Sequence, residues 1–93
     1  MRLKEQEIVK IKDTIIKEFG ESQIYIFGSR LDDSVRGGDI DIFVIPNKRE
    51  ELLKKSAKAE FFLETTLLKP IDILVHRDFE QEIEQIALKG IKI

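Results

Sequence analysis

The stretch that most constrains this chain runs from Ile24 to Ile45 and reads IYIFGSRLDDSVRGGDIDIFVI. An apolar run ends abruptly at Gly28, a polar connection containing glycines follows, and a second apolar run begins after Asp39. This pattern predicts two strands joined by a tight connection. Because side chains two apart on a strand share a face, Asp39 and Asp41 are expected to project together, away from Ile40.

These two carboxylates predict a cation site. Two like charges held side by side disfavour each other's ionised form, and the surrounding Ile and Val residues make the repulsion more costly. A hard divalent cation such as Mg2+ takes oxygen ligands and is the natural counter-charge. The acid pair therefore favours a metal-dependent site over a purely structural strand.

The connection between the two apolar runs offers groups that bind phosphate. Gly28 has no side chain, which lets a phosphate approach its backbone, and Ser29 adds a hydroxyl donor beside backbone N–H groups. Arg30 and Arg36 carry guanidinium groups that can hold phosphate oxygens in a bidentate fork. Together with the acids, these groups indicate chemistry on a nucleoside triphosphate. The alternative is an ordinary hairpin with an acidic, glycine-rich turn, which leaves the two acids without a role.

Composition narrows the classes of protein that the chain can be. Its 93 residues, formal net charge of −2 and 42% hydrophobic content predict one domain over residues 1–93. The absence of cysteine excludes a disulfide framework and a thiolate metal site. Apolar runs too short for a membrane span and a charged N-terminus, MRLKEQEIVK, predict a cytoplasmic protein that does not enter a membrane.

The charge balance also bears on partners. Sixteen basic residues against eighteen acidic ones do not give the basic surface that duplex nucleic acid requires. No GxxxxGK[ST] motif occurs in the sequence, so a P-loop ATPase is not supported.

The flanking segments predict helices around a small mixed sheet. Apolar spacing from about Leu3 to Phe19 predicts an amphipathic helix ended by Gly20. An N-cap at Asn47 with Glu50 three residues later predicts a second helix that starts near Lys48 and runs to about Thr65. The residues expected to point inward from that helix are Leu52, Leu53, Ala59, Phe62 and Leu63.

The C-terminal part predicts one more helix, capped by Asp78 and stopped by Gly90, which leaves residues 91–93 for a short terminal strand. The expected fold class is therefore α/β (α+β), with the order α-β-β-α-β-α. Near the end of the second helix, Phe61, Phe62, Leu67 and Leu68 give more apolar surface than one helix face needs. Core packing is the favoured interpretation, and a docking patch for a partner is the alternative.

Pro70 is followed by Ile71-Asp72-Ile73-Leu74-Val75, which predicts a third strand. A strand, helix and strand in succession normally cross over with the two strands parallel, which would bring Asp72 to the same edge as the first two acids. An acid within an apolar strand is costly to bury without a partner. The alternative is an edge-strand Asp that faces solvent. His76, at the strand end, is assigned no role.

The order of these motifs resembles a known superfamily. Gly28-Ser29 followed by Asp39-x-Asp41 resembles the GS…DxD signature of the DNA polymerase beta-like nucleotidyltransferases. The flanking FGSR and RGGDIDIFV are most similar to the minimal nucleotidyltransferases (MNT), which are often paired with HEPN-domain proteins. Residues 30–38 form a connection one residue shorter than is usual in that family, so their alignment within it stays open.

The resemblance implies a nucleotidyltransferase fold and a set of roles. Asp39, Asp41 and Asp72 would be the catalytic residues and would hold two Mg2+ ions. Gly28, Ser29 and Arg30 would bind the phosphates of the nucleotide, expected to be ATP. A HEPN-domain protein, often a ribonuclease toxin, would receive the nucleotide, which makes this chain its antitoxin.

Two other functions stay open. The chain could neutralise its partner by docking alone, with a vestigial nucleotide site, or it could modify a small molecule as antibiotic-modifying relatives do. The template-copying members of the superfamily are poor models, because this chain has neither their length nor their basic surface.

Overall fold

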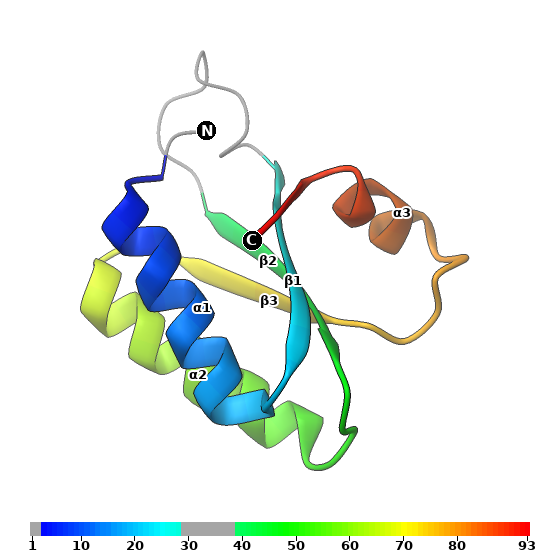
Figure 1. The fold of residues 1–93 in the computed structure, drawn as a ribbon, viewed down its shortest axis with the longest axis horizontal. Helices are drawn as coiled ribbons and strands as arrows, with labels where there is room; N and C mark the ends of the chain where they lie inside the picture. The colour runs from blue at the N-terminus through cyan, green and yellow to red at the C-terminus, as the bar shows by residue number, and fades with distance from the viewer. Residues whose placement is uncertain (1–2, 29–38) are drawn as a thin grey trace.

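The structure is a computed structural model that describes residues 3–28 and 39–93. Its helices α1 and α2 lie side by side, while α3 stands apart from them near the C-terminus (Figure 1). The elements are α1 (Glu5–Phe19), β1 (Ser22–Phe27), β2 (Ile40–Pro46), α2 (Leu52–Leu67), β3 (Ile71–Val75), α3 (Glu82–Leu88) and β4 (Ile91–Lys92). This order confirms the predicted α-β-β-α-β-α fold, with the short terminal strand added.

The strands form one mixed sheet in the order β3-β2-β1-β4. Strand β1 is antiparallel to both β2 and β4, whereas β2 and β3 are parallel. The parallel pair confirms the crossover expected for a strand, helix and strand in succession. Strand β3, which carries Asp72, is therefore an edge strand next to the strand that carries Asp41.

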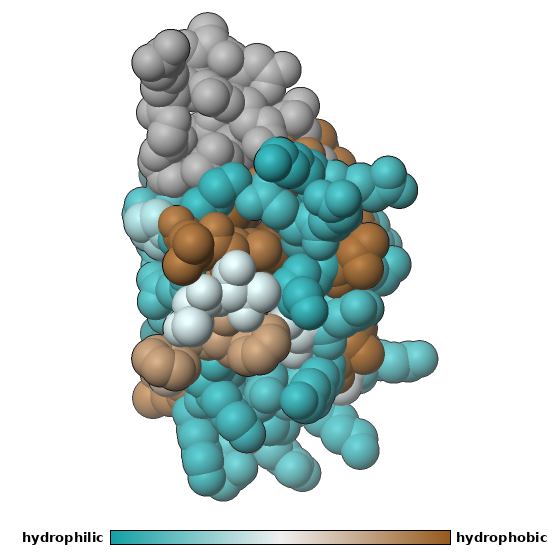
Figure 2. All heavy atoms as spheres, turned by 90° about the vertical axis from the view of Figure 1, so that its left-hand side faces the viewer, coloured by the Kyte–Doolittle hydropathy of each residue, from teal (hydrophilic) through white to brown (hydrophobic). Residues whose placement is uncertain are grey.

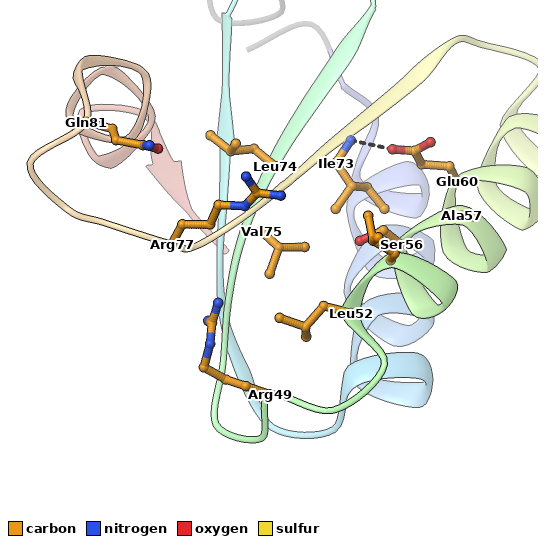
Figure 3. A pocket seen from close by; sticks show the side chains of 11 residues that line it. Arg49, Leu52, Ser56, Ala57, Glu60, Ile73, Leu74, Val75, Arg77 and Gln81 are labelled. Carbon is orange, nitrogen blue, oxygen red and sulfur yellow. Dashed lines mark hydrogen bonds between the residues drawn. The ribbon is translucent and has the colours of Figure 1, made fainter.

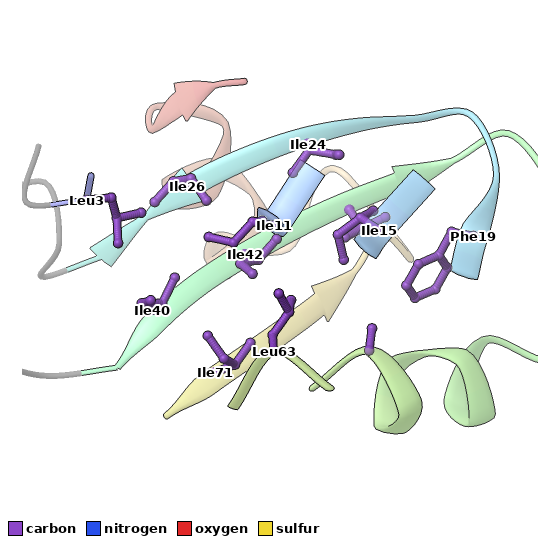
Figure 4. Packing of buried hydrophobic residues seen from close by; sticks show 12 residues of the cluster. Leu3, Ile11, Ile15, Phe19, Ile24, Ile26, Ile40, Ile42, Leu63 and Ile71 are labelled. Atoms are coloured by element: carbon purple, nitrogen blue, oxygen red, sulfur yellow. The ribbon is translucent and has the colours of Figure 1, made fainter. Parts of the chain in front are cut away.

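The hydrophobic core has one cluster on each face of the sheet. The larger cluster lies between the sheet and helices α1 and α2 (Figure 4). Its fully buried side chains include Ile11, Ile15, Ile24, Ile26, Ile40, Ile42, Val44 and Leu63. The smaller cluster joins Phe27 and Phe43 to Ala87 of α3. Alternate positions of β2 thus supply the two clusters, and the face shared by Asp41 and Phe43 is the one that α3 covers.

Helix α2 begins later than the sequence indicates. Its first residue is Leu52, and the residue before it, Glu51, adopts a left-handed conformation with φ 50°. The predicted capping box at Asn47 and Glu50 is therefore wrong. The residues of this segment form hydrogen bonds with distant parts of the chain instead. The Asn47 N–H donates to the Glu21 carbonyl at 3.0 Å, and the Arg49 guanidinium donates to the His76 carbonyl.

The inward face of α2 is also narrower than predicted. Ala59 and Leu63 are buried, but Leu53 is 82% exposed and Phe62 is 47% exposed, so the prediction was wrong for these two residues. The helix sits against α1 on one side and β3 on the other, and such a position buries only a narrow stripe of side chains spaced by three or four residues.

The apolar residues near the end of α2 do not form core. Phe61, Phe62 and Leu68 are exposed, and only Leu67 packs against the larger cluster. Figure 2 looks onto the α1–α2 side and shows apolar side chains gathered among hydrophilic ones. The core interpretation is therefore wrong for three of these four residues, and a docking role for them stays a prediction.

Helix α3 begins at Glu82 after Gln81, so the cap expected at Asp78 is wrong as well. The Asp78 carbonyl instead accepts the Gln81 N–H at 3.0 Å, in a turn that precedes the helix. None of the helices in the described part of the chain is both long and apolar enough to cross a bilayer.

Two carboxylates of α2 cover the outer edge of β3. Glu64 Oε2 accepts the Ile71 N–H at 3.1 Å, and Glu60 Oε1 accepts the Ile73 N–H at 3.0 Å. These N–H groups point away from β2, where a further strand would otherwise pair. The two side chains, one helical turn apart, thus satisfy an edge that would otherwise be a template for aggregation.

Replacing Glu60 with Leu is expected to lower the free energy of unfolding by about 1 kcal/mol and to increase self-association, because the Ile73 N–H loses its acceptor. Urea denaturation and light scattering at several protein concentrations measure the two effects. Glu50→Leu, at an exposed position outside the helix, is the control. Equal behaviour of the two variants would show that α2 does not protect this edge.

Candidate active site

Asp41 and Asp72 lie directly beside each other. They are register partners in the parallel pair of β2 and β3, and side chains of such partners project from the same face of a sheet. Phe27 is the register partner of Asp41 on β1. Phe27, Asp41 and Asp72 therefore form a row across three neighbouring strands, on the face of the sheet that α3 covers. The prediction that the third strand brings Asp72 next to Asp41 is confirmed.

Asp39 lies close enough to Asp41 for its negative charge to affect the pKa of Asp41. It precedes β2 and is exposed, whereas Asp41 is partly buried. Burial raises the pKa of Asp41, and the negative charges of Asp72 and then Asp39 raise it further. Ionisation of Asp41 is thus opposed by both of the other acids.

The donor chemistry of this group fits a divalent cation. Within residues 3–28 and 39–93, no three His, Cys, Asp or Glu side chains are gathered closely enough to form a metal-holding cluster. The Asp41–Asp72 pair nevertheless supplies two oxygen-donor groups of the kind that Mg2+ prefers. A cation between them would relieve the repulsion that raises the pKa of Asp41, with Asp39 as the third acid nearby.

An open pocket of about 420 Å3 contains both acids. Gly28, at the end of β1, contributes to one side, while Ile83 and Ile86 of α3 contribute apolar side chains to its lining. A pocket that joins two acids to a side-chain-free stretch of backbone can admit a charged, phosphate-bearing molecule.

A second pocket, of about 430 Å3, lies between α2 and the outer part of β3 (Figure 3). Leu52 and Val75 line it, and Arg49 and Arg77 stand at its rim. Its acid, Glu60, is already hydrogen bonded to the backbone of β3. Because this pocket contains no pair of acids, we assign the chemistry to the pocket that contains Asp41 and Asp72.

Gly28 stands against the carboxylate of Asp41. Its φ is +85°, a conformation that side-chain-bearing residues rarely adopt. A Cβ atom built on Gly28 would overlap Asp41 Oδ2 and lie 3.1 Å from its Cγ. Both the backbone conformation and the close approach therefore require glycine at this position.

Replacing Gly28 with Ala is expected to cost about 1–3 kcal/mol of stability through backbone strain and to displace the Asp41 carboxylate from its position beside Gly28. Gly20→Ala is the matched control, because Gly20 has a φ of +77° but nothing lies within 4 Å of its added Cβ. Urea denaturation measures the stability of both variants, and Gly28→Ala should lose more stability than Gly20→Ala. Equal losses in the two variants would contradict a cost from the close approach of Gly28 to Asp41.

The other residues predicted to bind phosphate, Ser29, Arg30 and Arg36, lie outside the described residues. Their roles stay predictions from the sequence.

Glu84 is a buried acid that the sequence analysis missed. Its side chain is fully buried on α3, and Oε2 accepts the N–H groups of Arg77 at 2.7 Å and Asp78 at 2.9 Å. Oε1 lies 2.7 Å from His76 Nδ1 and shares a hydrogen bond with it. Burial by itself would raise the pKa of Glu84, but the hydrogen bonds from His76, Asp78 and Arg77 outweigh it and lower the pKa overall.

This carboxylate fixes α3 to the end of β3. The ring of His76 stacks on Phe79 with centroids 3.8 Å apart and meets Phe43 edge-on at 6.4 Å. His76, which the sequence analysis left without a role, is therefore part of the anchor that positions α3. The signal in the sequence was that Glu84 lies three residues before Ala87, on the helix face that packs against the sheet.

Comparison with known proteins agrees with this geometry. A family model described as "Nucleotidyltransferase domain" matches residues 8–93, a range that contains β1, β2 and β3 with all three acids. A comparison with curated proteins found no match. On the match over most of its length, this chain belongs to the nucleotidyltransferase domain family of the polymerase beta-like superfamily, whose members transfer nucleotidyl groups.

Proposed function

We propose that this protein is a Mg2+-dependent transferase that moves AMP from ATP to a hydroxyl group of a partner protein. The observation that carries the proposal is the register of Asp41 and Asp72, which places two carboxylates side by side in a pocket that Gly28 leaves open. Membership of the nucleotidyltransferase family supports the reaction class.

The reaction joins the acceptor oxygen to the α-phosphorus of ATP. The bond between that phosphorus and the oxygen bridging to the β-phosphorus breaks, and pyrophosphate leaves. Asp39, Asp41 and Asp72 are the residues that would hold magnesium. The metal, when bound, would neutralise phosphate charge and lower the pKa of the acceptor hydroxyl.

The side chains of this chain have separable roles in that reaction. We assign the removal of the proton of the incoming hydroxyl to Asp72, which is more exposed than Asp41. Gly28 leaves its backbone open to the β- and γ-phosphates, and the sequence assigns Ser29 and Arg30 to the same phosphates. Ile83 and Ile86 supply an apolar wall on one side of the pocket.

The partner and the biological role come from the resemblance of FGSR and RGGDIDIFV to minimal nucleotidyltransferases. We propose that the acceptor is a HEPN-domain toxin and that modification of it by this chain makes the chain an antitoxin.

The test uses the protein encoded by the adjacent reading frame, incubated with this chain, Mg2+ and ATP labelled at the α-phosphorus. Wild-type protein and Asp13→Asn, a change at an exposed position of α1, should label the neighbour equally. The Asp72→Asn variant should still bind the neighbouring protein but should not label it. Neutralisation of the neighbour by Asp72→Asn at the wild-type level would favour inhibition by docking alone and would refute transfer as the antitoxin mechanism.

A further inference from the structure

The surface next to the acid pocket is both apolar and negatively charged. We call it the α3 surface, and it consists of Phe79, Glu80, Glu82, Ile83 and Ile86. The three apolar members are 45–49% exposed, and both acids are exposed. From residue 78 to residue 88 the exposed charged residues are all acidic, namely Asp78, Glu80 and Glu82, since the fourth acid, Glu84, is buried. The exposed basic residues Arg77 and Lys89 flank this range.

The α3 surface is continuous with the proposed catalytic pocket. Ile83 and Ile86 line the same pocket as Asp41 and Asp72 while roughly half of each isoleucine stays exposed. A molecule that brings a hydroxyl to the two acids from this side must pass over both isoleucines. The part of the acceptor that lies outside the pocket therefore meets the rest of the α3 surface.

The α3 surface is held in a fixed position. Glu84, on the buried side of the same helix, accepts hydrogen bonds from the Arg77 and Asp78 backbone and contacts His76. Phe79 stacks on the His76 ring at 3.8 Å. A surface that is ordered before binding loses less conformational entropy when a partner docks on it. Such a surface is suited to binding a folded macromolecule.

We infer that the acceptor is a protein that docks on the α3 surface through an apolar patch ringed by Lys and Arg, and that it presents its hydroxyl to the Asp41–Asp72 pocket. The inference rests on the proposed transfer function. Exposed apolar side chains favour a protein patch, and the surrounding acids favour a basic rim. A nucleic-acid acceptor is disfavoured, because its phosphates would face Glu80 and Glu82 of the α3 surface.

The experiment reverses the charge of the α3 surface without touching the pocket lining. Glu80→Lys/Glu82→Lys is compared with Glu21→Lys/Glu50→Lys, which makes the same change in net charge at exposed positions. The control residues flank the Ser22 and Pro46 ends of β1 and β2, the opposite end from Gly28 and Asp41. Each protein is incubated with Mg2+, ATP labelled at the α-phosphorus and an extract of its source cells.

Wild-type protein and the control pair should label a product that protease destroys and ribonuclease leaves intact. Glu80→Lys/Glu82→Lys should label it at least about tenfold more slowly at limiting acceptor, with unchanged MgATP affinity by calorimetry. Glu80→Gln/Glu82→Gln, which removes charge without reversing it, should give a smaller decrease. This second variant keeps the test valid if the Lys pair disturbs α3.

The outcomes separate the inference from the proposed function. Three results would overturn docking on the α3 surface and leave nucleotidyl transfer in place. The labelled product could be destroyed by ribonuclease, or both Glu80/Glu82 variants could label the acceptor at the wild-type rate. The third is that Glu21→Lys/Glu50→Lys slows labelling as much as Glu80→Lys/Glu82→Lys. Failure of the wild-type protein to bind MgATP, or to label anything, would refute the transfer function itself and the inference with it.

Discussion

Replacing Asp41 with Asn is expected to reduce nucleotidyl transfer to below about one hundredth of the wild-type rate, because even residues that only orient a metal ligand are worth 10–100-fold. The fold should be retained. Asn has the shape of Asp without its charge, and the charge of Asp41 is opposed by burial and by Asp72 and Asp39. Labelling by ATP carrying α-phosphorus label measures the rate.

The same variant should separate metal binding from folding. A carboxyl whose pKa is raised by folding makes the folded state less stable as the pH rises through that raised pKa. At neutral pH without metal, Asp41 therefore opposes folding, and Asp41→Asn should melt at the wild-type temperature or above it. Mg2+ should raise the melting temperature of the wild type and of Asp13→Asn, but raise that of Asp41→Asn much less. Full activity in Asp41→Asn, or an unchanged response to Mg2+, would exclude Asp41 as a metal ligand.

Replacing Glu84 with Ala is expected to lower the free energy of unfolding by about 3–5 kcal/mol, the usual cost of removing one member of a buried, hydrogen-bonded charge group. The loss leaves the N–H groups of Arg77 and Asp78 and the Nδ1 atom of His76 without their partner. A domain of this size has roughly 5–14 kcal/mol to lose. Glu82→Ala, at an exposed position of the same helix, should change stability by less than about 0.5 kcal/mol.

Glu84 should also make the wild-type protein sensitive to acid. Folding lowers the pKa of Glu84 below its ordinary value of 4.5, so its contribution to stability is complete above that value. The contribution is lost as the pH falls through the lowered pKa. Urea denaturation between pH 7 and pH 3 should therefore show a smaller acid-induced loss in Glu84→Gln than in the wild type. Parallel pH profiles would show that Glu84 is not held as a carboxylate.

Much of the fold could be predicted because its strands carry strong local patterns. Ile40, Ile42 and Val44 alternate with Asp41 and Phe43, and this period of two indicates a strand with distinct faces. The parallel placement of the third strand follows from the helix between it and the second strand, because such a crossover normally returns the chain to the same end of the sheet. These two rules predict parallel strands that carry Asp41 and Asp72, and the register observed in the structure makes the two acids direct neighbours.

The features that the sequence did not predict depend on contacts between distant segments. Arg49 reaches the His76 carbonyl, and α2 starts at Leu52 instead of near Lys48 although Asn47 and Glu50 have the local pattern of a capping box. Nothing local distinguishes Glu60 and Glu64 from solvated helix residues, because their partners are N–H groups of β3. Side-chain pairing across the fold, which no periodicity encodes, decided each of these cases.

The central claim is that the Asp41–Asp72 pocket transfers the nucleotidyl group of ATP. The most direct measurement follows two labels in parallel, one at the α-phosphorus and one at the γ-phosphorus, with the full chain, Mg2+ and the acceptor. Our account predicts that the α-label enters the acceptor while the γ-label is released in pyrophosphate. With Asp41→Asn, neither labelling of the acceptor nor release of pyrophosphate should occur. Transfer of the γ-label to the acceptor, or its release as orthophosphate by the wild type, would contradict nucleotidyl transfer.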